Sequence, residues 1–421
     1  MLITYFRELH PTTRRLLMTR ALRSIGQGAL VVDFTLYLHA LHWSATAIGL
    51  LLGAGGLFGA GLNLLVGMTS DRRQRKPILI IYEAVALISS LAVVFTVQTW
   101  VLAVAAIISG FGRGANGAAG PFAPAEQAWL AEEIPAERRG WVYSLNASLG
   151  FFGMGLGALS ATLPVVWAGL FPGALAYRPL FGLVAVAALL GLILLATAYE
   201  RPRHPQAFTS SQQKQQAVTI RRQENQILTK LVFINGFNGL AVGLTGPLMS
   251  YWFLRRFGVG AESIAPVMAA TFIITGLMSL VTGKLTERIG LVSSVVWERF
   301  MGLGLLILLP LMPSYGWASL VYLLRSVLTR GSAGAQQALT ISLVQDERRG
   351  LASSLNAVST QLPRSAGPAI AGYLLSLGQF SLPFYFAAFF QGIYLLLYHR
   401  VFHQFEPNHR NGRTQKENVN Q

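Results

Sequence analysis

The stretch ERRGWVYSLNA, Glu137 to Ala147, returns as ERRGLASSLNA, Glu347 to Ala357, with eight of eleven letters unchanged. The same spacing of 210 residues pairs AEQAW (Ala125–Trp129) with AQQAL (Ala335–Leu339), and Gly157 with Gly367. A polar phrase that recurs at so long an interval, with its neighbours, indicates that the chain consists of two related halves.

The composition indicates that both halves lie in a membrane. Of the 421 residues 53% are hydrophobic and 12% are charged, and the mean hydropathy is +0.49. Soluble domains carry about 25% charged residues. The absence of cysteine excludes a disulfide framework and a thiolate metal site. The first fifteen residues lack the apolar core and cleavage site of a signal peptide, so we expect the first apolar segment to remain as a membrane helix.

Twelve segments are long and apolar enough to cross a bilayer, which requires about 20 residues each. They are residues 16–41, 45–69, 77–97, 99–128, 140–163, 179–199, 229–254, 264–283, 292–312, 316–340, 351–376 and 382–402. The polar stretch from Glu200 to Gln226 separates the sixth segment from the seventh. We therefore predict an all-α polytopic membrane protein with two pseudo-symmetric six-helix bundles at 1–199 and 229–402, a cytoplasmic linker at 200–228 and a cytoplasmic tail at 403–421.

The basic residues predict the orientation of the chain. Most of the 33 Lys and Arg residues fall in loops on one side, which also holds both termini and the linker. The opposite loops hold only Arg178, Arg255 and Arg256. Because basic loops stay cytoplasmic, we expect both termini inside the cell. The net charge of +16 is then explained by topology and anionic lipid, and no nucleic-acid partner is expected.

Two loops carry a further pair of related motifs, GMTSDRRQRKP (Gly67–Pro77) and GKLTERIG (Gly283–Gly290). Here the sequence resembles the major facilitator superfamily (MFS), in particular its drug/proton antiporters. Its signature Gly-x-x-x-Asp-Arg-x-Gly-Arg-Arg/Lys is matched at Gly67, Asp71, Arg72, Arg75 and Lys76, with Gln74 in place of the second glycine. The family motif Arg-x-x-Gln-Gly occurs as RGANG, Arg113 to Gly117. Glycines 150, 153, 155 and 157 follow the antiporter pattern, although the expected Gly-Pro pair lies at Gly367–Pro368 instead.

The resemblance implies a gate at the cytoplasmic face, locked when the protein faces outward. Gly67 lets its helix approach a neighbour closely, and Asp71 is expected at the amino end of the helix that begins near residue 350, where an anion is favoured. Glu287 would mirror it in the other half. The remaining expected gate residues are Arg72, Arg75, Glu126, Arg138, Gly283, Arg288 and Arg348. The alternative is that these charges only satisfy topology, and Glu126 could also be an interfacial side chain.

Asp33 and Arg113 are the candidates for proton coupling. Ionisable groups inside a membrane are costly and therefore suggest function, and both residues reach the middle to outer half of the predicted bilayer. An Asp–Arg pair could switch with protonation, because the cation favours the carboxylate and burial disfavours it. A static ion pair that specifies packing is the alternative. Arg20 and Arg23 are expected to extend to the cytoplasmic interface.

The second half contains Arg330 and Arg364 near the expected midplane, with no acid at similar depth. A substrate anion would explain them, because guanidinium groups suit carboxylate and phosphate; bonding to freed backbone carbonyls explains them equally well. The expected substrate cavity contains Gln27, Tyr37, Asn116, Asn238, Tyr251, Trp252, Arg330, Gln361 and Arg364. Any one of the polar and aromatic members could instead serve helix packing.

These features predict a secondary transporter that works by alternating access. Proton-coupled efflux of amphiphilic organic compounds is the first hypothesis, and transport of an organic anion through Arg330 and Arg364 is the second. A membrane-embedded enzyme or lipid-handling protein would need a catalytic cluster, which the sequence lacks. No ATP-binding motif, cofactor or metal site is found. We expect a monomer in the inner membrane whose partners are a small-molecule substrate, protons and lipid.

Overall fold

The computed structural model describes residues 9–70, 74–113, 120–134, 139–200, 213–289, 291–331, 336, 339 and 349–403. Within these ranges some side chains are also left outside the description, among them those of residues 67–70, 213–223, 279–289 and 349–354. The described residues form helices and contain no strand, as the sequence predicts.

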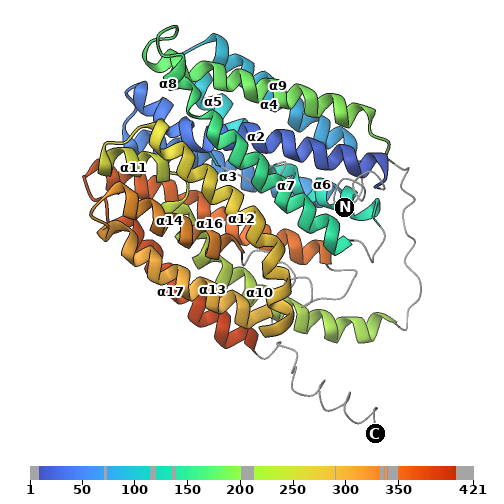
Figure 1. The fold of residues 1–421 in the computed structure, drawn as a ribbon. Helices are drawn as coiled ribbons and strands as arrows, with labels where there is room; N and C mark the ends of the chain where they lie inside the picture. The colour runs from blue at the N-terminus through green and yellow to red at the C-terminus, as the bar shows by residue number, and fades with distance from the viewer. Residues whose placement is uncertain are drawn as a thin grey trace.

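The helices of the first half run from α2 to α9. They are α2 (Pro11–Ala40), α3 (Ala45–Ser70), α4 (Arg75–Phe95), α5 (Thr99–Ser109), η1 (Gly120–Phe122), α6 (Ala123–Glu132), α7 (Arg139–Ser160), α8 (Leu163–Val166), η3 (Gly173–Tyr177) and α9 (Arg178–Thr197). They lie in the upper part of Figure 1.

The helices of the second half run from α10 to α17. They are α10 (Gln213–Thr245), α11 (Met249–Phe257), α12 (Ala261–Ile289), α13 (Leu291–Leu308), η4 (Leu309–Leu311), α14 (Tyr315–Gly331), α16 (Arg349–Ser376) and α17 (Leu382–Phe402). They lie in the lower part of Figure 1. We call the end of the bundle where α2 begins and α17 ends the terminal face, and the end where α2 leads into α3 the opposite face.

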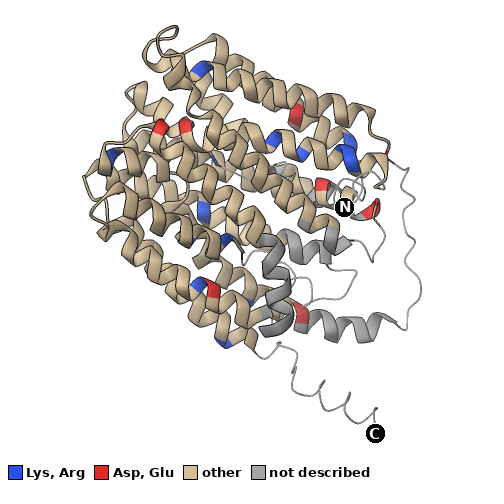
Figure 2. Cartoon of the chain, viewed as in Figure 1, with Lys and Arg blue, Asp and Glu red and all other residues tan. Residues whose placement is uncertain are grey.

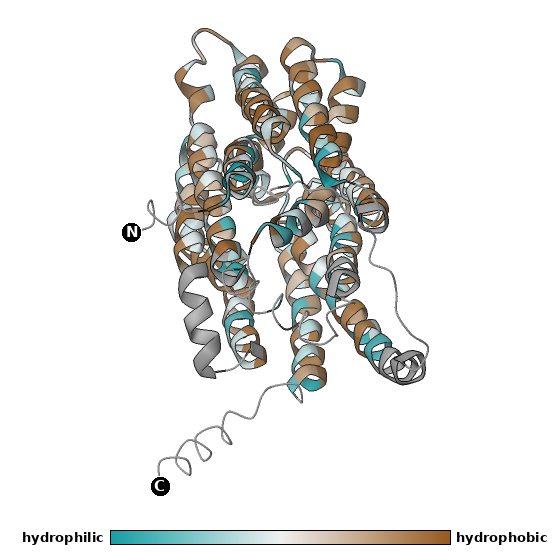
Figure 3. Cartoon of the chain, turned by 90° about the vertical axis from the view of Figure 1, so that its right-hand side faces the viewer, coloured by the Kyte–Doolittle hydropathy of each residue, from teal (hydrophilic) through white to brown (hydrophobic). Residues whose placement is uncertain are grey.

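The surface of the bundle suits a lipid environment. Eight segments of the described chain are long and apolar enough to cross a membrane. Figure 2 shows that charged residues are sparse along the described helices, and Figure 3 shows hydrophobic residues along their flanks. The 30-residue helix α2 is more polar, but Arg20, Arg23 and Asp33 are all buried inside the protein. The fold is that of a polytopic membrane protein.

The fourth predicted segment, 99–128, is not one continuous helix. Helix α5 ends at Ser109, where Gly110 adopts a left-handed conformation (φ 74°), and α6 begins at Ala123. Gly112 is also left-handed (φ 76°), a conformation that costs glycine little. The prediction of a continuous helix is wrong here because hydropathy does not report backbone conformation. Non-helical backbone at this depth is tolerated only where protein or a cavity surrounds it.

The second half departs from prediction at two places. The seventh segment is split into α10 and α11 by Gly246 and Pro247, since proline lacks the N–H that a continuous helix needs. Helix α10 also begins at Gln213, inside the stretch predicted as a linker. The sequence QKQQA at this point consists of good helix formers.

Glycines allow the halves to pack closely near the opposite face. On α3, a Cβ at Gly49 would overlap the backbone carbonyl of Pro368 on α16, and one at Gly56 would lie 2.6 Å from the Cβ of Ser365. On α7, a Cβ at Gly155 would lie 2.7 Å from Ile273 on α12. Helix pairs α3–α16 and α7–α12 therefore join the two halves through small residues, as membrane helices commonly do.

Two other glycines of α7 pack inside the first half. A Cβ at Gly153 would lie 2.6 Å from Ser24, and one at Gly157 would overlap the carbonyl of Ile25 on α2. Within the glycine pattern noted in the sequence, Gly153 and Gly157 thus allow α7 to approach α2, and Gly155 allows it to approach α12.

Candidate functional site

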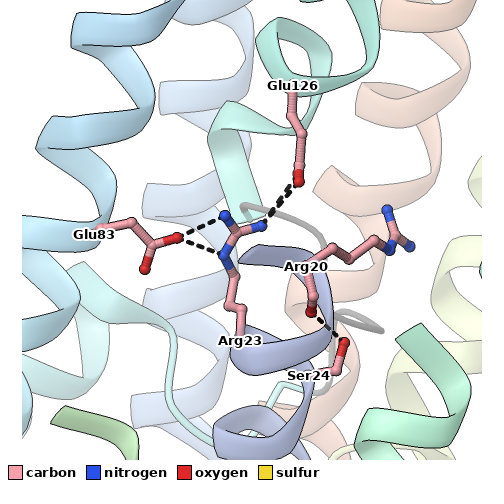
Figure 4. A network of polar contacts seen from close by, with 5 residues as sticks. All are labelled: Arg20, Arg23, Ser24, Glu83 and Glu126. Atoms are coloured by element: carbon pink, nitrogen blue, oxygen red, sulfur yellow. Dashed lines mark hydrogen bonds and ion pairs between the residues drawn. The ribbon is translucent and has the colours of Figure 1, made fainter. Parts of the chain in front are cut away.

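A cluster of charged side chains is buried in the first half, toward the terminal face (Figure 4). Arg23 on α2 donates from Nε and Nη2 to Oε1 of Glu83 on α4, at 2.9 and 2.6 Å. Its Nη1 donates to both carboxylate oxygens of Glu126 on α6, at 3.2 and 3.1 Å. The side chains of Arg23, Glu83 and Glu126 are 6%, 1% and 4% exposed. Arg23 therefore joins three helices and does not extend to the interface, so that prediction is wrong.

The surroundings of this cluster are partly polar. The Arg23 guanidinium lies 5.2 Å from the centre of the Tyr82 ring, a cation–π geometry. Arg20, one turn earlier on α2, is also buried, its side chain points away from Arg23 in Figure 4, and its Nε has no hydrogen-bond partner among the described residues. Gly191 on α9 leaves room for Glu83, because a Cβ there would lie 3.2 Å from the carboxyl carbon.

A cavity of about 50 Å³ adjoins the cluster. Its polar lining includes Arg23, Gln27 and Glu83, and the backbone from Ser109 to Gly112, where α5 ends. A cavity needs roughly 10–15 Å³ to hold one water molecule, so this one has room for a few. The predicted cavity residue Gln27 thus faces a space inside the first half, between α2, α4 and α9.

Asp33 is buried in α2 nearer the opposite face. It is 1% exposed, and neither carboxylate oxygen has a hydrogen-bond partner among the described residues. It lies within electrostatic range of Tyr177 in η3. An ionised carboxylate without partners is very costly in such a place.

The ion pair between Asp33 and Arg113 is not formed in this structure. Nη1 of Arg113 donates instead to the backbone carbonyl of Gly55 on α3. Arg113 also lies beside Gln361 of α16, since a Cβ at Gly59 would contact both side chains. The predicted pairing is therefore absent here, and Arg113 follows the break after α5 and contacts α3 and α16 instead.

Further arginines of the second half lie on α14 and α16. Arg364 on α16 lies within electrostatic range of Arg330 and Arg113. The Arg330 guanidinium lies 4.7 Å from the centre of the Phe272 ring, and Arg325 donates to Thr245 Oγ1 at 3.4 Å. Arginines within electrostatic range of one another repel, and a bound anion would offset that repulsion.

Other residues predicted for the substrate cavity serve packing in this conformation. The ring of Tyr37 lies 5.7 Å from Tyr177, and Tyr251 lies 5.4 Å from His39 across the two halves. Trp252 is buried and its Nε1 donates to the carbonyl of Phe380. Asn116 lies outside the described residues. Their role in binding stays a prediction.

The second half contains a buried arginine that the sequence analysis missed. Arg299 on α13 donates from Nη1 to Oδ1 of Asn238 on α10, and from Nη2 to Oε1 of Gln336 at 3.1 Å. It also stacks 5.0 Å from the Tyr394 ring on α17. The 210-residue repeat could have pointed to this arginine, because it pairs Glu126 of AEQAW with Gln336 of AQQAL, and Gln336 binds Arg299.

The predicted gate residues are only partly described. Asp71, Arg72, Arg138 and Arg348 lie outside the described residues. Gly67 lies in α3, and Gly283, Glu287 and Arg288 lie in α12, but their side chains are outside the description. Their contacts therefore stay predictions.

Arg75 is buried and pairs with Glu132 of α6 at 2.9 Å. The backbone N–H groups of Arg75 and Lys76 donate to the Glu200 carboxylate at 2.7 and 2.9 Å. Nζ of Lys76 donates to the carbonyls of Ala196 and Ala198, each at 2.7 Å. Burial raises the pKa of Glu200, and the N–H and charge of Lys76 oppose this shift. The start of α4 and the end of α9 therefore cap each other at the terminal face.

No group of three or more metal-ligating side chains occurs within the described parts of the chain. Two helical halves, with charges buried inside each, are the architecture of a secondary membrane transporter.

Comparisons with known proteins agree with this class. The family model of the Major Facilitator Superfamily matches residues 16–327 and 231–419. The multidrug resistance protein MdtG of Proteus mirabilis (strain HI4320) is 22% identical over 347 residues, which cover 80% of this chain and 82% of that protein. The chain belongs to the Major Facilitator Superfamily, whose members are transporters and not enzymes.

Solved structures show the same fold. A bacterial homologue of the human lysosomal transporter Spinster, inward-facing and unoccupied, aligns with a TM-score of 0.70 at 16% identity, covering 94% of this chain and 98% of that one. The D-xylose-proton symporter aligns with a TM-score of 0.67 at 16% identity, covering 92% and 96%. At these identities the likeness concerns the fold alone.

Proposed function

We propose that this transporter exports amphiphilic organic compounds in exchange for protons. The terminal face is cytoplasmic in this proposal, and the chain works as a monomer in the inner membrane. Its two halves rock about a site between them, with lipid around them and no cofactor. The name of the relative MdtG, a multidrug resistance protein, supports export, as does the glycine pattern of α7.

The observation that carries the proposal is the state of Asp33. A carboxyl that is buried without a hydrogen-bond partner is far more stable protonated than ionised. Protonation of such a group, followed by release after a change of access, is what an exchange with protons requires. The alternative of a static ion pair with Arg113 lacks support, because Arg113 bonds to Gly55.

Asp33→Asn is expected to abolish proton-driven transport, because asparagine fills the same space but binds no proton. The assay uses the full chain in proteoliposomes with an imposed pH gradient and a panel of fluorescent amphiphiles that includes ethidium. Gradient-driven flux should fall to the level of protein-free liposomes, while exchange without a gradient persists. Glu262→Gln, which removes an exposed acid at the opposite face, is the control. Unchanged flux in Asp33→Asn would remove Asp33 from the mechanism, and a wild type indifferent to the gradient would refute proton coupling.

A second candidate, transport of an organic anion, is favoured by the arginines around Arg364. Carboxyfluorescein, a fluorescent carboxylate, is the probe, and its saturable binding to the purified protein is measured by fluorescence anisotropy. Arg330→Ala and Arg364→Ala are each expected to abolish binding, whereas Arg364→Lys weakens it, since lysine keeps the charge but not the forked geometry. Equal binding by wild type and both alanine variants would exclude this site.

A further inference from the structure

We propose, on the basis of the proton coupling proposed above, that Glu83 and Glu126 form a second proton-binding site, in which Arg23 bridges the two carboxylates. The site lies on the terminal side of Asp33. Ten residues of α2 separate Arg23 from Asp33, or about 15 Å at 1.5 Å per residue. Protons would then bind at two levels beside α2, at Asp33 and at the two acids that Arg23 bridges.

The two acids share one bridging cation. The guanidinium of Arg23 has five N–H donors. Its three nitrogens all donate hydrogen bonds to Glu83 or Glu126. A proton on either carboxylate forms an O–H bond, removes that group's charge and weakens its bond to Arg23, which keeps the other acid. Only a proton is exchanged, and it comes from water or from another carboxyl.

The charged and titratable groups around Glu83 and Glu126 come from four parts of the described chain. Helix α2 contributes two cations, α4 and α6 contribute one group each, and the segment after α5 contributes a further cation near Tyr82. They are Arg20, Arg23, Tyr82, Glu126 and Arg113. The residues of α9 near the acid or the cavity carry no titratable group; they are Val184, Ala187, Ala188 and Gly191. With Arg113 bound to Gly55, two cations and two acids make up the immediate cluster, so uptake of a proton leaves it positive.

The second half offers a comparison, because it also contains a buried arginine, Arg299. Glu126 corresponds to Gln336 in the repeat. Arg299 on α13 donates to the side-chain amides of Asn238 and Gln336, stacks on Tyr394 and lies within electrostatic range of Glu298. Amides can hold the helices together, whereas only the carboxylates can also bind and release a proton.

The cavity gives Glu83 a place to meet water. On α2 it is lined from Arg23 to Leu30, which stands three residues before Asp33, and Gln27 lies between. Water in this space would extend from the Glu83 carboxyl most of the way to Asp33. A few ordered waters suffice, because each can donate and accept hydrogen bonds.

Proton binding at Glu126 also acts on the backbone. Glu126 stands in the first turn of α6, which the break after Ser109 separates from α5. Loss of the Arg23–Glu126 ion pair would therefore free α6 from α2 without disturbing α5. Because α6 leads to the terminal face, this contact connects protonation to access from that side.

The experiment compares Glu126→Gln and Glu83→Gln with wild type in the full chain. In proteoliposomes both variants should lose gradient-driven ethidium transport while ethidium exchange without a gradient is retained, as the amide cluster of the second half suggests. In infrared difference spectra between acid and alkaline buffer, wild type should show the band of protonated carboxyl groups, reduced in each variant. Glu262→Gln should match wild type in both measurements, and thermal unfolding confirms that each variant is folded.

The outcomes separate the two proposals. Glu83 and Glu126 do not form a proton site if both variants respond to the gradient as strongly as wild type does. The same conclusion follows if the infrared band is unchanged in both variants. If wild type does not respond to the gradient, the proposed proton coupling itself fails, whatever the variants do. If exchange and gradient-driven transport are lost together in a folded variant, the acids have a structural role only.

Discussion

Gly49→Leu is expected to abolish transport by preventing closure of the opposite face. Gly49 on α3 lies against the backbone of Pro368 and Gly372 on α16, and a Cβ at Gly49 would overlap the Pro368 carbonyl. A backbone atom cannot move aside as a flexible side chain does, so the two helices must separate. Overpacking of this kind costs about 1–3 kcal/mol, which shifts an equilibrium between two states by about 5–150-fold. The variant should therefore populate states open at that face and fail to cycle.

The distance between α3 and α16 can be measured directly, because the chain has no cysteine. Thr46 and Ser376 stand on these helices at the opposite face, and their hydroxyl oxygens are 3.1 Å apart. Thr46→Cys with Ser376→Cys should cross-link readily alone, and poorly when Gly49→Leu is added. Gly61→Leu is the matched control, because it lies on the same helix and a Cβ there meets nothing within 4 Å. If Gly49→Leu and Gly61→Leu give equal cross-linking and equal transport, the close approach at Gly49 is unimportant.

The sequence predicted the architecture because its signals are long or repeated. Apolar segments, the bias of basic loops and the 210-residue repeat each report on many residues at once. The glycines of α7 were also recognisable, although their division between α2 and α12 was not. A glycine shows that something approaches closely, and only the packed structure shows what.

The contacts of the buried charged side chains could not be predicted, because they depend on how each helix is rotated about its axis and on where helices are interrupted. Counting residues placed Arg23 near the interface, yet neighbouring helices surround it and supply Glu83 and Glu126 from distant parts of the chain. The same counting put Asp33 and Arg113 at one depth, but the left-handed Gly110 and Gly112 turn Arg113 toward α3. Local propensity does not specify such breaks, and they occur next to the proposed proton sites, where function permits irregular backbone.

Arg23→Leu is expected to destabilise the protein more than any other single change to the buried charges. Removal of the guanidinium leaves Glu83 and Glu126 buried side by side with like charges, and breaking a buried ion pair in this way costs about 3–5 kcal/mol. Thermal unfolding of the purified chain in detergent measures the loss at neutral pH. The loss should shrink in acid, because protonated carboxyl groups carry no charge to bury.

Two further variants distinguish uncompensated charge from lost packing. The triple variant Arg23→Leu, Glu83→Gln, Glu126→Gln should recover most of the stability, since replacing a whole buried ion cluster by neutral groups is often neutral or stabilising. Arg299→Leu in the second half removes an equally buried arginine from its amide partners Asn238 and Gln336, leaving unsatisfied polar groups that cost about 1–3 kcal/mol. If Arg299→Leu and Arg23→Leu lose the same stability, and the triple variant recovers none, Arg23 contributes by its shape. If instead the loss follows the number of carboxylates left behind, Arg23 stabilises the two buried acids by its charge, and release of either acid from Arg23 requires a proton.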